Sequence, residues 1–312
     1  MVKTKVRIGF AGTPKIAFDH FSKLLEIDNI SIEFVLTQPN KASGRGLTQK
    51  ESLFANQNNK IPVYQPENLN SQSAKDLICS HAIDLMVVVA YGKLIPNWLL
   101  AYPKNGCLNV HFSLLPEHRG AAPMQRAIAN GDKVSGVSFM KLDEGLDEGP
   151  VYEKVVTNIE NKDFYEVEDL LLESSINKIG SVIESIQDGL EAQNQDHSKA
   201  SYAEKIDKDE GKINWHLPSA HIKNKFRAFK KWPQCYFDLK GEKTKILSLD
   251  IDTSRTGRPG EVCAFDKQSL DIFCKDGVVS ITAVQFPGKK VISSLDFFNS
   301  KRDIISKGDL LI

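Results

Sequence analysis

The sequence predicts an α/β protein with an open, mostly parallel, doubly wound sheet, followed by a small β-barrel of the OB type. Strand and helix signals alternate through residues 1–189, a rhythm typical of parallel sheets with helices on both faces. Residues 190–202 are polar and lose this periodicity, which indicates a linker. Beyond them, short strand signals follow one another closely with turn residues between them, as in small barrels.

The elements of the first part follow from the spacing of apolar residues. β-branched apolar runs predict buried parallel strands, whereas apolar residues three and four positions apart predict helices. Proline at position 123 and glycines at 131 and 189 are typical of helix starts and ends. The expected strands are 6–12, 31–38, 84–92, 106–113, 136–142 and 150–157, and the expected helices are 15–26, 73–82, 123–132 and 165–189.

The second part begins with a basic helix and continues with strands. The helix is expected at 218–231, and the strands at 234–239, 244–250, 260–265, 270–274 and 277–286. We therefore expect a domain at 1–189, a linker at 190–203 and a second domain at 204–312.

Charge and cysteine content narrow the class of protein. Residues 1–198 carry 19 Lys and Arg against 25 Asp and Glu, and residues 199–312 carry 21 against 15. The N-terminal part of this neutral chain is therefore acidic and the C-terminal part is basic. The basic part could hold a polyanion, although the same charges also serve solubility. Five scattered cysteines without C-x-x-C spacing indicate reduced thiols and no zinc site. With no apolar run of membrane-spanning length and no signal peptide, we expect a cytoplasmic protein that binds no membrane.

The chemistry is expected where strands end, because open α/β sheets bind ligands at the carboxyl ends of their strands. Asn109 and His111 end one strand, and the turn 143–150 supplies Asp147. An Asn amide and a protonated His can donate to an oxyanion, while a carboxylate orients the ring and helps to move protons. The alternative left open by spacing alone is a structural histidine beside a turn-forming asparagine.

Other motifs exclude or suggest ligands. Gly9 and Gly12 do not complete a dinucleotide fingerprint, and the phosphate-loop lysine signature is absent. The long loop 38–50 holds Arg45 between two glycines, and such loops are either functional or mobile. Five basic residues interleaved with aromatics lie in the basic helix, which indicates either a phosphate-binding surface or a solvated helix face. They are Lys223, Lys225, Arg227, Lys230 and Lys231.

The chain resembles the N10-formyltetrahydrofolate-dependent formyltransferases. The motifs "NVHFSLLP", "GLDEG" and "RGAAPMQRAI" carry this resemblance, and "FAGTP", "VVAYG", "SYAEKI", "FRAFKKWP" and "VQFPGKK" extend it over the whole chain. The segments "RGAAPMQRAI" and "PGKK" are similar to those of the branch that acts on tRNA.

The resemblance implies the activity and the site. Asn109, His111 and Asp147 match the catalytic residues of the family, and the formyl group would pass from 10-formyltetrahydrofolate to the methionine amino group of initiator methionyl-tRNA. No metal is implied, and a monomer is expected. Arg45 and the basic helix would contact tRNA. The folate would lie against Val89, Tyr91, Gly92, Ser113, Leu114, Leu115, Pro116 and Leu142.

Several positions depart from the family's pattern, and related activities remain open. Ala42 replaces a usual proline in the loop, and Phe112, Glu117 and Glu148 replace other usual residues. A formyltransferase for sugar-nucleotide amines or a formyltetrahydrofolate hydrolase would keep the same three catalytic residues. A non-catalytic RNA-binding protein is the alternative from another class.

Overall fold

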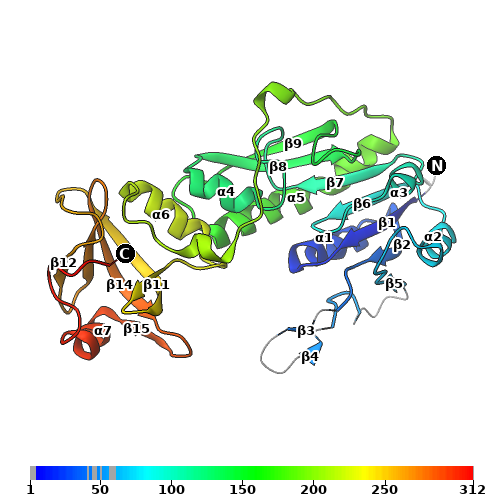
Figure 1. Cartoon of the computed structure of the whole chain (residues 1–312). Coiled ribbons are helices and arrows are strands. Elements are labelled where there is room, and N and C mark those ends of the chain that lie inside the picture. The colour runs from blue at the N-terminus through cyan, green and yellow to red at the C-terminus, as the bar shows by residue number, and fades with distance from the viewer. Residues whose placement is uncertain (1–4, 41, 44–47, 50, 56–60, 312) are drawn as a thin grey trace. The chain divides into compact units, whose positions relative to one another are not determined.

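The computed structural model describes residues 5–311 except 41, 44–47, 50 and 56–60 (Figure 1). The chain divides into two compact units. The first unit contains residues 1–120, 135–158 and 169–203, and the second contains residues 121–134, 159–168 and 204–312.

The first unit is built on one sheet of the expected α/β type. Its strands lie in the order β5-β2-β1-β6-β7-β8-β9. The pairs β5–β2, β2–β1, β1–β6 and β6–β7 are parallel, and β7–β8 is antiparallel. The bounds are Val6–Gly12 (β1), Ile30–Leu36 (β2), Val63–Tyr64 (β5), Leu85–Val89 (β6), Cys107–His111 (β7), Val134–Lys141 (β8) and Val151–Asn158 (β9).

Helices cover both faces of this sheet. Adjacent residues of a strand point to opposite faces, so the contacts of two neighbours in β1 show what covers each face. Ala11 of β1 packs in a cluster with Ile78 of α2 (Gln72–Cys79) and Leu99 of α3 (Asn97–Ala101). Its neighbour Phe10 packs edge-to-face on Phe21 of α1 (Lys15–Leu25). The doubly wound fold class is thereby confirmed.

One side of the sheet also holds a buried polar pair. His20 of α1 lies 2.8 Å from the hydroxyl of Ser175 in α5 (Phe164–Gln187) and 2.7 Å from the carbonyl oxygen of Ile16. The ring of Phe112 packs edge-to-face against His20. The departure from the family's pattern at position 112 therefore fills a place in the core.

The second unit contains an antiparallel sheet, as expected for a small β-barrel domain. Its strands lie in the order β10-β11-β14-β13-β12, and β15 pairs with β14. The bounds are Tyr236–Leu239 (β10), Glu242–Asp252 (β11), Val262–Phe265 (β12), Leu270–Phe273 (β13), Val278–Gln285 (β14) and Val291–Ser293 (β15). The unit also holds α4 (Pro123–Asn130), α6 (Ser219–Ala228) and α7 (Ser294–Lys301).

The hydrophobic pattern did not predict every short element. The two-residue strand β5, the five-residue helix α3, strand β15 and helix α7 were missed. So were β3 (Ala42–Ser43) and β4 (Thr48–Gln49), which form a small sheet of their own. Strands of two or three residues and a helix of five carry too few residues to show a period, whereas α7 has eight residues and was missed although α2 and α4 are equally long.

Candidate active site

Asn109 and His111 lie together at the carboxyl end of β7. Because they are two positions apart in a strand, both side chains point to the same face of the sheet. Asn109 lies between Val88 of β6 and Met140 of β8, and His111 lies opposite Ser138. Asn109 is half-buried, and no described residue pairs with its amide. A polar amide is thus left available at the strand end.

The two ring nitrogens of His111 have different partners. The ring is 6% exposed, and its Nε2 lies 3.0 Å from the carbonyl oxygen of His118. A carbonyl only accepts, so Nε2 carries a proton and donates it. Nδ1 faces the carboxylate of Asp147, with 3.6 Å between Nδ1 and Oδ2. This distance is longer than a hydrogen bond, which leaves Nδ1 accessible to a further partner.

Asp147 is held by a turn with an unusual backbone. Its φ is +53°, in the left-handed region, and its Oδ2 accepts a hydrogen bond of 2.8 Å from the backbone N–H of Gly120. Gly120 is required there, because its φ is +116° and an added Cβ would lie 2.8 Å from the carbonyl oxygen of Ala203. The structure therefore brings Asp147 to His111 through a contact that only glycine permits.

Strained backbone is concentrated in this region. Of the six non-glycine residues with positive φ in the described part of the chain, three are Ala90, His118 and Asp147. Ala90 follows β6, His118 supplies the oxygen that Nε2 of His111 contacts, and Asp147 faces Nδ1. Each such conformation costs ~1–3 kcal/mol and persists only where its surroundings enforce it. The strain supports the assignment of a functional site.

The residues expected to bind folate differ in their access to solvent. Leu114, Pro116 and Leu142 are partly exposed and Gly92 is exposed, so these four can contact a ligand directly. The side chains of Val89, Tyr91, Ser113 and Leu115 are buried. Each of these four residues is at most 1% exposed as a whole, so none of them reaches the surface of the site.

The hydroxyl groups of two of these buried residues, Ser113 and Tyr91, differ in their partners. The Ser113 hydroxyl donates to the carbonyl oxygen of Glu117 at 2.6 Å, which closes the loop after β7. Burial raises the pKa of Tyr91 to about 12, and its hydroxyl has no partner among the described residues. Tyr91 therefore stays a neutral phenol that does not take part in proton transfer at neutral pH.

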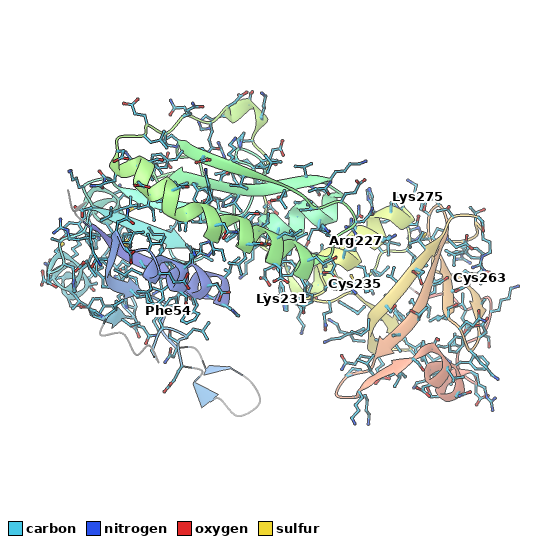
Figure 2. All side chains as sticks on the ribbon, turned by 180° about the vertical axis from the view of Figure 1, so that it is seen from behind. Phe54, Arg227, Lys231, Cys235, Cys263 and Lys275 are labelled. Atoms are coloured by element: carbon cyan, nitrogen blue, oxygen red, sulfur yellow. The ribbon has the colours of Figure 1, made fainter. Side chains whose placement is uncertain are left out.

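The basic helix expected at 218–231 ends at Ala228 as α6, and the basic residues in and just after it mostly have partners inside the second unit (Arg227 and Lys231 are labelled in Figure 2). Arg227 donates to the carbonyl oxygen of Lys162 at 2.6 Å and to Asn224 at 2.7 Å. Lys231 pairs with Glu168 at 2.8 Å, and Lys225 donates to the carbonyl oxygen of Lys212. These contacts support the interpretation of α6 as a packed helix.

Two basic residues of the set, Lys223 and Lys230, make no hydrogen bond or ion pair with another described residue. Lys223 is exposed, and the Lys230 ammonium lies over the Phe226 ring at 4.4 Å. Arg45, the remaining expected tRNA contact, lies outside the described residues.

Two residues important to the site were not singled out by the sequence. Arg119 is 1% exposed and Gln195 is 8% exposed, and the two are hydrogen-bonded to each other. Arg119 belongs to the quoted RGAAP segment, whereas Gln195 lies in the polar stretch expected to be a linker. Their contact joins positions 76 apart, so no local pattern could have revealed it.

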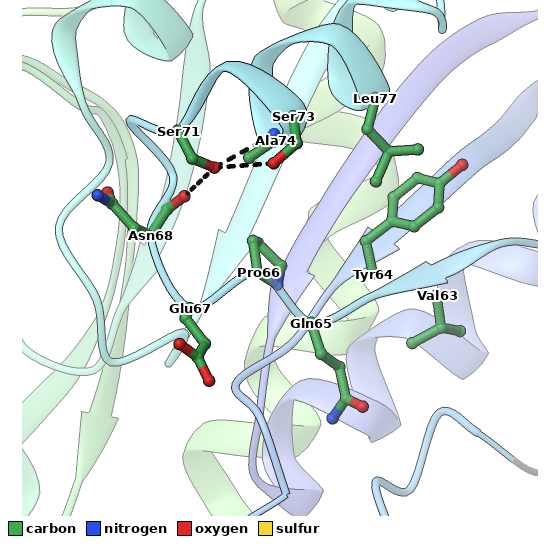
Figure 3. Close-up of a pocket in the computed structure, with 10 residues that line it drawn as sticks. All are labelled: Val63, Tyr64, Gln65, Pro66, Glu67, Asn68, Ser71, Ser73, Ala74 and Leu77. Carbon is green, nitrogen blue, oxygen red and sulfur yellow. Dashed lines mark hydrogen bonds between the residues drawn. The ribbon is translucent and has the colours of Figure 1, made fainter.

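A surface cavity between the loop after β5 and the start of α2 is lined by residues 63–68, 71, 73, 74 and 77 (Figure 3). None of these belongs to the expected site. The described residues contain no cluster of three His, Cys, Asp or Glu side chains suited to a metal ion. Among them, no helix has the length and apolarity needed to cross a membrane.

The fold and the site define a class of enzyme, and comparison with known proteins gives the same class. The chain belongs to the formyl transferase family, whose "Formyl transferase" profile matches residues 6–175 and whose "Formyl transferase, C-terminal domain" profile matches residues 205–302. Within it, the chain belongs with the methionyl-tRNA formyltransferases. It is 40% identical to that of Pseudomonas entomophila over 98% of this chain and 99% of the relative. It is 39% identical to that of Stutzerimonas stutzeri over 98% of both chains.

Solved structures show the same fold at low sequence identity. HypX from Aquifex aeolicus in complex with tetrahydrofolic acid superposes with a TM-score of 0.66 at 15% identity, covering 99% of this chain and 51% of that one. Methionyl-tRNA formyltransferase from Clostridium thermocellum gives a TM-score of 0.59 at 13% identity, covering 90% and 98%.

Proposed function

We propose that this protein transfers the formyl group of 10-formyltetrahydrofolate to the amino group of methionine on initiator methionyl-tRNA. The observation that carries the chemistry is the arrangement of His111 and Asp147, 3.6 Å apart, beside the half-buried Asn109. The relatives named methionyl-tRNA formyltransferase support the choice of acceptor.

Asn109, His111 and Asp147 have separate roles in the acyl transfer. The neutral amine attacks the formyl carbon, and the carbonyl electron pair moves onto oxygen. The Asn109 amide and the Nδ1–H of a protonated His111, whose Nε2–H stays on the carbonyl oxygen of His118, donate to that oxyanion, which replaces the stabilisation that water would give. Asp147 takes the proton that the amine releases, directly or through one water. The electron pair on the oxyanion then re-forms the carbonyl as the bond from carbon to N10 breaks, Asp147 gives its proton to N10, and tetrahydrofolate leaves.

The site offers surfaces that fit the folate. Three partly exposed residues, Leu114, Pro116 and Leu142, place apolar atoms beside the catalytic groups. Gly92 adds exposed backbone to this set. Ligand sites of this kind combine apolar contacts with a few polar groups that fix orientation.

The second part of the chain is proposed to bind the tRNA. Residues 1–189 would form the catalytic domain and residues 204–312 the tRNA-binding domain, with Lys223 and Lys230 contributing free positive charge. We further propose a monomer in the cytoplasm. The cysteines support a reducing compartment, because all five lie in the described part of the chain and are unpaired.

The test compares three acceptors with the purified full chain and 10-formyltetrahydrofolate. One reaction contains methionyl initiator tRNA, one contains an amino sugar nucleotide, and one contains water alone. We expect formylated methionyl-tRNA to form fastest. If the tRNA stays unformylated while the sugar nucleotide reacts, or while folate is released with no acceptor present, the proposal is wrong.

A further inference from the structure

The polar segment 190–203 does more than connect two domains. Its backbone pairs with β9, where Gln193 and Val151 exchange hydrogen bonds of 2.8 and 2.9 Å. Further along, the N–H of Arg119 donates to Ser201 at 2.8 Å, and the N–H of Ala203 donates back to Arg119 at 2.6 Å. The segment is thus attached to the start of β9, which follows the Asp147 turn, and to the loop after β7, which follows His111.

Gln195 is the point where the segment meets the turn of Asp147. Its Nε2 donates to the carbonyl oxygen of Asp147 at 2.9 Å and to that of Gly149 at 2.7 Å. A glutamine amide has two N–H donors, so both are used. A side chain at position 149 would not fit, because an added Cβ would lie 1.9 Å from the carbonyl oxygen of Lys141.

Arg119 determines which way the Gln195 amide points. Its Nε and Nη2 donate to the amide oxygen at 3.2 and 2.8 Å. Guanidinium groups only donate, so the oxygen of Gln195 must face Arg119 and the NH₂ group must face the turn. The buried guanidinium is in turn held by Glu148 at 3.4 Å and His197 at 3.2 Å. Glu148, which departs from the family's pattern, therefore helps to hold the guanidinium of Arg119.

The held carbonyl belongs to the residue whose backbone is strained. Asp147 has a φ of +53° and places its carboxylate between the Gly120 N–H and Nδ1 of His111. Without the hydrogen bonds from Gln195, the turn could relax toward an ordinary backbone conformation. The carboxylate would then move, and a displacement of about 1 Å can cost ~100-fold in rate.

We infer that Gln195 is a positioning residue: its amide, oriented by Arg119, holds the Asp147 turn so that the carboxylate faces His111. This inference rests on the proposed function only in assigning Asp147 and His111 to the chemistry. The geometry itself is independent of the acceptor.

The main test uses Gln195→Met, which keeps the size of the side chain and removes its hydrogen bonds. We expect kcat to fall by ~10–100-fold while KM for folate and for acceptor changes by less than about threefold. The matched control is Gln193→Met, because Gln193 is exposed and uses its backbone for pairing. It should keep wild-type kcat.

A second variant separates positioning from folding. Gln195→Glu keeps an acceptor for Arg119 but removes the donors to the turn, so it should fold yet be as slow as Gln195→Met. If only this variant folds, it alone decides the question. A kcat within twofold of wild type in a folded variant of either kind would overturn the inference.

A double-mutant cycle tests the route of the effect. If Gln195 acts through Asp147, adding Gln195→Met to Asp147→Asn should slow single-turnover transfer by less than about twofold. An undiminished 10–100-fold loss in that background would refute the inference.

A measurement without any acceptor separates this inference from the proposed function. In protein with labelled histidines, the ring-nitrogen NMR signals of His111 should change in Gln195→Met and stay unchanged in Gln193→Met. Unchanged His111 signals in Gln195→Met would contradict the positioning role even if wild type formylates tRNA. Failure of wild type to formylate tRNA, with altered His111 signals, would overturn only the acceptor.

Discussion

Nε2 of His111 lies 3.0 Å from the carbonyl oxygen of His118, so one nitrogen of the buried ring is already committed as a donor. Only Nδ1 is left to change its partner during a reaction, and it faces Asp147. The left-handed backbone of His118, with φ of +56°, puts its carbonyl in this place. The direction of the ring is therefore determined by the loop after β7.

Asp147→Asn tests the proton-transfer role. The variant should lose ~100- to 10,000-fold in kcat, because an amide cannot take a proton from the attacking amine. Asn tolerates the φ of +53° at this position, so the fold should be kept. Steady-state rates and thermal melting measure both effects. Near-normal turnover would remove Asp147 from the catalytic set.

Asn109→Ala tests the oxyanion donor. Loss of one such donor lowers kcat by ~100-fold or more and leaves KM nearly unchanged. Stability should change little, since no described residue pairs with the amide. Asn105→Ala serves as the control, because Asn105 precedes the other end of β7 and donates to Gln187. Equal rate losses in the two variants would argue against a catalytic amide.

Lys223→Ala and Arg227→Ala should have different consequences. Removing the exposed Lys223 should weaken tRNA binding and lower the slope of log Kd against log salt by about one. Removing Arg227 takes donors from Lys162 and Asn224, so the free energy of unfolding should fall by ~1–3 kcal/mol. Filter binding over a salt series and urea unfolding give the two quantities. An unchanged slope for Lys223→Ala would leave α6 without a role in tRNA binding.

Substitutions of Arg119 and Arg7 allow the contacts of a buried arginine to be compared with those of an exposed one. Arg119 is 1% exposed and donates to the buried amide oxygen of Gln195, so Arg119→Met, which leaves that oxygen unpaired, should lower the free energy of unfolding by ~1–3 kcal/mol. The side chain of Arg7 is 47% exposed, so Arg7→Met should lower the free energy of unfolding by much less than Arg119→Met. Urea unfolding midpoints measure the difference. Equal losses would mean that burial does not control the cost.

The buried His20 should make the free energy of unfolding depend on pH. Burial lowers the pKa of His20 from 6.5 to about 4, so the unfolded chain binds the proton more readily than the folded one. The neutral ring therefore contributes stability above pH 6.5, and up to about 3 kcal/mol is lost as the pH falls from 6.5 toward 4. Urea unfolding at several pH values checks this for wild type and His20→Gln. The variant should lose less stability on acidification, whereas the exposed His221→Gln should behave as wild type.

The order of the main elements was predictable because it depends on local patterns. Buried runs such as 6–12 and 84–92 became β1 and β6, and the amphipathic stretch 165–189 became α5 within one or two residues of its bounds. The place of Asn109 and His111 also followed from local pattern, because residues two apart at a strand end share a face. These features depend only on neighbours along the chain.

The sequence by itself determined the fold class, the strand that presents Asn109 and His111, and the family. Only the tertiary structure decided which nitrogen of His111 is free, that Arg227 and Lys231 are engaged within the second unit, and that Gln195 holds the turn of Asp147. The physical reason is distance along the chain. Hydrogen bonds of buried polar groups join residues tens of positions apart, and no periodic pattern encodes such partners.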